Sequence, residues 1–273
     1  MSMRAKFFLI YFKYFYSISQ KAYACKNIFG YTFTPHQNKV TPMHNRMLIL
    51  DLYRALAVVL MLIFHFAYDL HYFRFTEVST VDSLFWIRLR TIIVTLFMTA
   101  VGMSLYLAYA KAFNTQKYLK RLLLLGICAL MVSVGTFFVF PQTWVYFGVL
   151  HMVFIATLIG PLFVRVPHLS ALIGVLILGL YYLEYRISFF FELLKAPLHL
   201  PLGHTEDLVP LIPWFAPVLF GIFAMHYLHD KLILKSTPSL DKLAFIGRHS
   251  LIIYLIHQPI FFALLSATTY MLR

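Results

Sequence analysis

Cysteine and charged residues are scarce in this sequence, and each shortage excludes a class of protein. Only two cysteines, Cys25 and Cys128, occur among 273 residues, too few for a disulfide framework or a thiolate metal cluster. Charged residues make up 12% of the chain, whereas hydrophobic residues make up 61% and the mean hydropathy is +0.79. Soluble domains of this size do not have such a composition. The sequence therefore predicts an all-α fold, a polytopic transmembrane helical bundle.

Acidic residues are also few, because 10 Asp and Glu stand against 23 Lys and Arg, which gives a formal net charge of +13. A nucleic-acid partner would explain such an excess, but the basic residues gather in short segments between apolar runs. The positive-inside rule explains this distribution through membrane topology. Most of the Lys and Arg residues lie on one side if the amino terminus is cytoplasmic, so we expect that orientation and no nucleic-acid partner.

The apolar runs predict about seven membrane spans, each long enough for a hydrocarbon core of about 30 Å. No internal repeat and no matched pair of broken helices, which mark many transporters, occurs in the sequence. The longest polar interruption, residues 186–208, is expected on the outer side. The expected spans are residues 47–72, 85–110, 119–140, 144–164, 169–185, 209–228 and 243–265.

Residues 1–46 form a basic, aromatic-rich segment that differs from the transmembrane domain expected over residues 47–273. Lys13 interrupts its most apolar stretch, which disfavours a signal peptide. Three interpretations stay open: an interfacial segment attracted to anionic lipid, a poorly ordered tail, and a translation start at Met43 or Met47.

The first expected span, residues 47–72, is largely apolar but carries Asp51, Arg54, His65 and Asp69. At about 100° per residue, Arg54 and His65 return to within roughly 20° of each other, and Asp51 and Asp69 lie on the same stripe. Ionisable groups at bilayer depth are costly and persist mainly where they face a bundle interior or a wet cavity. We therefore interpret this helix as the wall of a site. Anchoring of Asp51 and Arg54 at the membrane interface is the alternative.

His65 and Asp69, one helical turn apart, have the form of a general base and its orienting carboxylate. A neutral imidazole can take a proton from an attacking hydroxyl or amine, and the carboxylate fixes its tautomer and stabilises the imidazolium. A structural histidine hydrogen-bonded to Asp69 is the other interpretation. No HExxH motif or thiolate cluster accompanies the pair, so we expect no metal.

Two more histidines in apolar runs are secondary candidates. His151 opens the fourth expected span, where it either joins His65 or makes an ordinary helical hydrogen bond. His257 lies midway in the last expected span, and the residues after it, Gln258 and Pro259, suggest a packed, water-lined break in the helix.

A cationic pair, Arg248 and His249, opens the last expected span on its cytoplasmic side. Such side chains hold phosphate through charge-assisted hydrogen bonds. The pair is therefore a candidate phosphate-binding site, although anchoring of the helix at the lipid headgroups explains it equally well.

Several stretches of the sequence resemble the heparan-alpha-glucosaminide N-acetyltransferase catalytic-domain family, whose bacterial branch is the DUF1624 group. They are DLYRALAVVLMLIFHFAYDLHYF, LFMTAVGMSL, GVLHMVFIATLIGPLF, LVPLIPWFAPVLFGIF and FIGRHSLIIYLIHQPI, and they lie within residues 48–262. The spacing from Arg54 to His65 also resembles the arginine-and-histidine pattern of the broader membrane acyltransferase group. The eukaryotic heparan enzymes have no histidine matching His65. Their catalytic histidine lies in a following loop, and His71 is the nearest residue here.

The resemblance implies an integral membrane acyltransferase of the bacterial inner membrane. It would transfer an acyl group, typically acetyl, from acetyl-CoA or another acyl-CoA to an amine or hydroxyl of an extracytoplasmic carbohydrate or glycolipid. His65 would be the general base or transient acyl carrier, and Asp69 its orienting group. Arg54, Arg248 and His249 would bind the CoA donor.

The alternative from another class is a proton-coupled transporter or flippase, in which His65 and Asp69 relay protons and Arg54 gates the path. Acyl-CoA binding distinguishes the two, because it should stabilise the enzyme and not the carrier. The sequence is compatible with a homodimer and leaves the oligomeric state open.

Overall fold

The computed structural model describes residues 42–77, 83–184, 197, 200–201, 205–231, 234 and 236–272, with side chains from residue 48 onward. Within these ranges the regular elements are helices, and one isolated parallel bridge joins Phe147 to Leu208. The predicted all-α class is therefore confirmed for this part of the chain. Residues 1–41 lie outside it, so the interpretations of the amino-terminal segment stay predictions.

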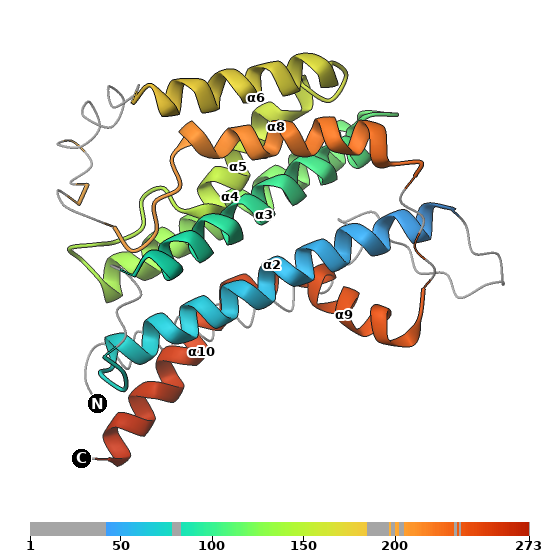
Figure 1. Cartoon of the computed structure of the whole chain (residues 1–273). Coiled ribbons are helices and arrows are strands. Elements are labelled where there is room, and N and C mark those ends of the chain that lie inside the picture. Colours follow the sequence, from blue (N-terminus) through green and yellow to red (C-terminus); the bar gives the residue numbers. More distant parts are fainter. Residues whose placement is uncertain are drawn as a thin grey trace. The chain divides into compact units, whose positions relative to one another are not determined.

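Five helices in the described ranges are long and apolar enough to cross a membrane. They are α2 (Pro42–Tyr72), α3 (Leu84–Tyr109), α4 (Thr115–Val139), α8 (Leu211–Leu228) and α10 (Ser250–Met271), shown in Figure 1. Two apolar helices are shorter, namely α5 (Val149–Ile159), which continues as the 3-10 turn η1 (Gly160–Leu162), and α6 (Pro167–Tyr182). The protein is an integral, multi-pass membrane protein. Seven spans and a cytoplasmic amino terminus stay predictions.

One face of α4 shows why these helices suit a bilayer. Along it, Leu123 is 66% exposed and Leu130 is 62% exposed. Residues three and four positions apart share one face of a helix, so the exposed apolar side chains form a continuous stripe. Contact with lipid chains accounts for such a stripe, because exposing a continuous apolar surface to water is unfavourable. Its members are Leu119, Leu123, Ile127, Leu130 and Val134.

The chain divides into two compact units. The first unit includes Leu107–Ala216, where α4 packs against α5. The second unit comprises Val40–Tyr106 and Pro217–Arg273. In this second unit α2 packs against both α9 (Pro238–Arg248) and α10, as Figure 1 shows. All four ionisable residues of the predicted stripe on α2 lie in the second unit.

The last expected span, residues 243–265, is divided in the structure. α9 ends at Arg248, and α10 begins at Ser250. α9 has its own N-cap, because the hydroxyl of Thr237 accepts a hydrogen bond from the backbone N–H of Leu240 at 3.4 Å. The prediction of one continuous helix from residue 243 was therefore wrong, and the apolar span begins at Ser250.

The expected break at His257 and Pro259 was also wrong. α10 runs without interruption from Ser250 to Met271 with Pro259 inside it. Neighbouring helices and local adjustments commonly allow proline within membrane helices. His257 and Gln258 therefore project from a continuous helix, which gives both side chains a fixed place.

Two glycines bring the backbones of α3 and α8 together within the second unit. A Cβ atom at Gly102 would lie 2.8 Å from the carbonyl carbon of Val218. A Cβ atom at Gly221 would lie 3.1 Å from the carbonyl carbon of Thr99. Glycine at both positions permits this approach, as small residues do in many membrane helix pairs.

We expect Gly102→Val to lower the free energy of unfolding by about 1–3 kcal/mol, because the backbone of α8 cannot move aside as a flexible side chain can. Gly179→Ala is the control, since a Cβ at Gly179 meets nothing within 4 Å. It should stabilise the protein by roughly 0.5–1 kcal/mol through helix propensity. Thermal unfolding in detergent measures both variants, and equal midpoints would contradict the close packing of α3 and α8.

Candidate functional site

The polar stripe on α2 forms two clusters within the second unit. We name the first the ionic cluster, which consists of Asp51, Arg54, Ser104 and Arg248. We name the second the histidine cluster, which consists of His65, Asp69, His257 and Gln258. From Arg54 to His65 the helix rises by about 16 Å, at 1.5 Å per residue. One membrane helix therefore carries both clusters at different depths.

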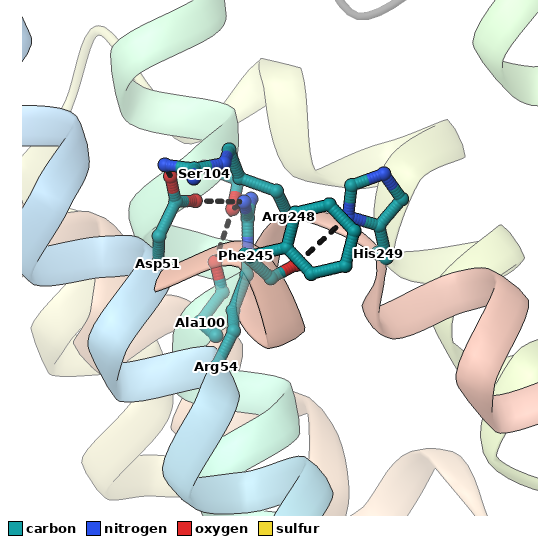
Figure 2. A network of polar contacts seen from close by, with 7 residues as sticks. All are labelled: Asp51, Arg54, Ala100, Ser104, Phe245, Arg248 and His249. Carbon is teal, nitrogen blue, oxygen red and sulfur yellow. Dashed lines mark hydrogen bonds and ion pairs between the residues drawn. The ribbon is translucent and has the colours of Figure 1, made fainter. Parts of the chain in front are cut away.

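Asp51 is the buried centre of the ionic cluster, at 5% exposure. Its Oδ1 atom accepts a hydrogen bond from Nη1 of Arg54 at 3.2 Å, and its Oδ2 atom lies 3.8 Å from Nη1 of Arg248. Nη2 of Arg54 donates to the hydroxyl of Ser104 at 2.6 Å, and that hydroxyl donates to the carbonyl of Ala100. Figure 2 shows these side chains meeting from α2, α3 and α9. Two guanidinium groups thus share one carboxylate.

Gly247 explains how α9 reaches the ionic cluster. A Cβ atom at this position would lie 3.0 Å from the Cα atom of Asp51, so the backbone of α9 packs directly against that of α2. The next residue, Arg248, is thereby placed beside the Asp51 carboxylate. Nη2 of Arg248 also donates to the carbonyl of Asp241 at 3.2 Å, which holds the guanidinium along α9.

The three predicted donor-binding cations differ in accessibility. The side chain of Arg54 is 22% exposed, whereas that of Arg248 is 40% exposed. His249 is half-buried, and its Nδ1 donates to the carbonyl of Phe245 at 2.8 Å (Figure 2). Arg54 therefore acts mainly within the cluster, and Arg248 is the guanidinium that a ligand reaches more easily.

The two imidazoles of the histidine cluster are oriented by backbone carbonyls. Nδ1 of His65 lies 3.0 Å from the carbonyl of Met61, and Nδ1 of His257 lies 2.7 Å from that of Tyr254. A carbonyl oxygen can only accept, so Nδ1 carries the proton in each neutral ring and Nε2 carries the lone pair. The rings meet edge to face with their centroids 4.7 Å apart. Each ring can therefore take up a proton at Nε2.

Asp69 lies one turn beyond His65 on α2 and is fully buried. Its Oδ1 atom accepts a hydrogen bond from Nε2 of Gln258 at 3.0 Å, which pairs the carboxylate with α10. Met61 supplies the hydrogen-bond acceptor described above for Nδ1 of His65. The role of Asp69 as the orienting group of His65 stays a prediction. Sequence reasoning did not assign Gln258 to the site, although an amide in an apolar run was a usable signal.

The two remaining histidine candidates have hydrogen-bond partners of their own. His151 belongs to the first unit, where its Nδ1 accepts from the backbone N–H of Gly148 at 3.2 Å and its Nε2 lies 3.0 Å from the hydroxyl of Ser133. These bonds fit a histidine that secures the start of α5. Nδ1 of His71 lies 3.3 Å from the carbonyl of Thr76, just after α2 ends.

Comparison with protein-family models matches residues 46–259 to the model described as heparan-alpha-glucosaminide N-acetyltransferase, catalytic. The match extends over well more than half of the chain and includes every residue of the ionic and histidine clusters. The comparisons with curated proteins and with solved structures gave no match.

Proposed function

The chain belongs to the heparan-alpha-glucosaminide N-acetyltransferase catalytic family, and on this premise we propose that it transfers an acetyl group from acetyl-CoA across a membrane. Another acyl-CoA would use the same site. The acceptor is an amine or hydroxyl of a carbohydrate or glycolipid on the outer side of a bacterial inner membrane. One observation supports this most: a cationic cluster and a proton-accepting histidine cluster lie along the same membrane helix.

The ionic cluster suits the phosphate-bearing end of acyl-CoA. Asp51 neutralises only one of its two guanidinium partners, so an excess positive charge remains. Arg248 is the more exposed partner and can bind a phosphate through charge-assisted hydrogen bonds. Arg54, held by Asp51 and Ser104, keeps the carboxylate in place. His249 follows Arg248 directly, and in its imidazolium form its Nε2–H adds a further donor at the same end.

The histidine cluster suits the reacting end, because acyl-CoA carries its thioester far from its phosphates. Nε2 of His65 takes the proton from the acceptor amine or hydroxyl as the acceptor atom bonds to the thioester carbonyl carbon. The carbon–sulfur bond then breaks, and the leaving thiolate receives the proton from His65. The Nδ1 hydrogen bond to Met61 holds the tautomer that this exchange requires.

We expect acetyl-CoA to raise the thermal midpoint of the purified protein. At an acetyl-CoA concentration of 100 Kd, binding adds about 2.7 kcal/mol to the free energy of unfolding. Arg248→Gln should weaken this binding by about tenfold or more, because it removes a charge-assisted contact to phosphate. Arg88→Gln is the control, since Arg88 is an exposed arginine of α3 outside the ionic cluster. Dephospho-CoA derivatives should shift the midpoint of the wild type less than acetyl-CoA does.

A folded wild type that acetyl-CoA does not stabilise at any concentration would contradict the proposed function and favour a carrier. Equal acetyl-CoA binding by Arg248→Gln and Arg88→Gln would remove Arg248 from the donor site and leave the transferase assignment standing.

A further inference from the structure

Three atoms of the histidine cluster are buried and have no hydrogen-bond partner among the residues that the structure describes. They are Oδ2 of Asp69, Nε2 of His257 and Oε1 of Gln258. Asp69 is fully buried and His257 is 5% exposed. Buried polar atoms in proteins nearly always have a partner, and leaving one without any is costly. Three such atoms in one cluster therefore indicate a place where another molecule binds.

Each of the three atoms is a hydrogen-bond acceptor. Nδ1 of His257 donates to Tyr254, so the neutral ring offers a lone pair at Nε2. The amide nitrogen of Gln258 donates to Oδ1 of Asp69, so Gln258 offers its carbonyl oxygen. The second oxygen of the Asp69 carboxylate also accepts. The complementary ligand is therefore a group that donates several hydrogen bonds.

The three residues lie beside the proposed base. The hydrogen bond from Gln258 to Asp69 joins α10 to α2 at one end of the cluster. The edge-to-face contact of His65 with His257 joins the same two helices one turn away along α2. A donor group held by these acceptors therefore lies next to the imidazole of His65.

We propose that Asp69, His257 and Gln258 bind the amino or hydroxyl groups of the acyl acceptor, and that Gln258 positions Asp69 for this. The inference rests on the proposed function and adds the residues that hold the acceptor. Asp69 thereby serves substrate binding in place of the orienting role expected from its spacing to His65. An acceptor that presents several N–H or O–H groups close together matches this set of atoms.

The test measures thermal midpoints of the full chain in detergent with increasing glucosamine, N-acetylglucosamine or glucose, and separately with acetyl-CoA. Asp69→Asn keeps the shape of the side chain but replaces one accepting oxygen with an amide donor. We expect it to raise the sugar concentration for half-maximal stabilisation by about tenfold or more, as for a lost hydrogen bond to a charged group. Gln258→Leu should raise it as well, because Asp69 loses its hydrogen bond.

Asp230→Asn makes the same chemical change on a side chain that is 67% exposed, and it should bind sugar as the wild type does. The acetyl-CoA shift should stay unchanged in all these variants, which separates loss of acceptor binding from general damage to the fold. A wild type that none of the three sugars stabilises overturns the inference, as does Asp69→Asn with unchanged sugar binding. Absence of the acetyl-CoA shift in a wild type that does bind sugar defeats the proposed transferase function instead.

Discussion

Replacing His65 by alanine should lower the rate of acetyl transfer by about 10²–10⁴-fold, the usual contribution of a positioned general base. Nδ1 of His65 is committed to the carbonyl of Met61, so Nε2 is the nitrogen that takes the proton of the acceptor. The side chain is only half-buried, and its removal should leave the fold intact. Single-turnover transfer from labelled acetyl-CoA measures the chemical step without product release.

His71→Ala is the informative comparison, because His71 is the histidine nearest to the loop position used by the eukaryotic enzymes. We expect it to retain activity within about tenfold of the wild type, since its Nδ1 faces the carbonyl of Thr76 at the end of α2. Full activity in a folded His65→Ala protein would contradict the assignment of the base. Loss of activity in His71→Ala alone would move that role to His71. Acetyl label that stays on the wild-type protein without acceptor, and that His65→Ala does not retain, would make His65 an acyl carrier.

Replacing Asp51 by alanine should lower the free energy of unfolding by about 2–5 kcal/mol, the range for removing one partner of a buried charge pair. The carboxylate is buried, and it faces the guanidinium groups of both Arg54 and Arg248. Without it, two positive charges lie together with no carboxylate between them. Thermal unfolding in detergent, compared with wild type at the same protein and lipid content, measures the loss.

A second substitution tests this explanation. Arg54→Met in the Asp51→Ala background removes the more buried guanidinium and should restore part of the lost stability. Arg88→Met in the same background is the control, because Arg88 is exposed and should restore nothing. An Asp51→Ala protein as stable as the wild type would contradict the view that Asp51 balances the charges of the ionic cluster.

Periodicity within one helix was enough to find half of each cluster. Residues separated by nearly a whole number of helical turns share a face. The sequence alone therefore places Asp51, Arg54, His65 and Asp69 on one stripe. The cost of ionisable groups in an apolar helix then marks the stripe as a site. Both inferences need only residues that are close together in the chain, and for that reason the sequence was sufficient for them.

Partners from other helices could not be found in the same way. Ser104, Arg248 and Gln258 are far from α2 in the sequence, and only the packing of α3, α9 and α10 brings them to it. The approach of Gly247 to Asp51 depends on backbone contact between two helices, which hydropathy does not encode. The hydrogen bond between Asp69 and Gln258 depends on that packing. The sequence suggested His65 as the partner of Asp69, because the two residues are one helical turn apart.

The start of α9 is a different case, because the sequence did contain a signal for it. Thr237 followed by Pro238 is a common start of a helix, and Asp241 in the first turn suits the positive end of its dipole. Hydropathy instead predicted one long helix that starts at residue 243, because the apolar run there continues past Arg248. Capping residues therefore located the start of α9 better than the apolar run did.

The most direct measurement is acetyl transfer by the purified protein in proteoliposomes, with labelled acetyl-CoA outside and an amino sugar such as glucosamine inside. We expect labelled sugar in the lumen, formed in proportion to the protein and reduced by about 10²–10⁴-fold in His65→Ala. A folded protein that binds acetyl-CoA and gives labelled product only on the side of the donor would contradict transfer across the membrane. A folded protein that yields no labelled product from any amine or hydroxyl acceptor would contradict the acetyltransferase itself.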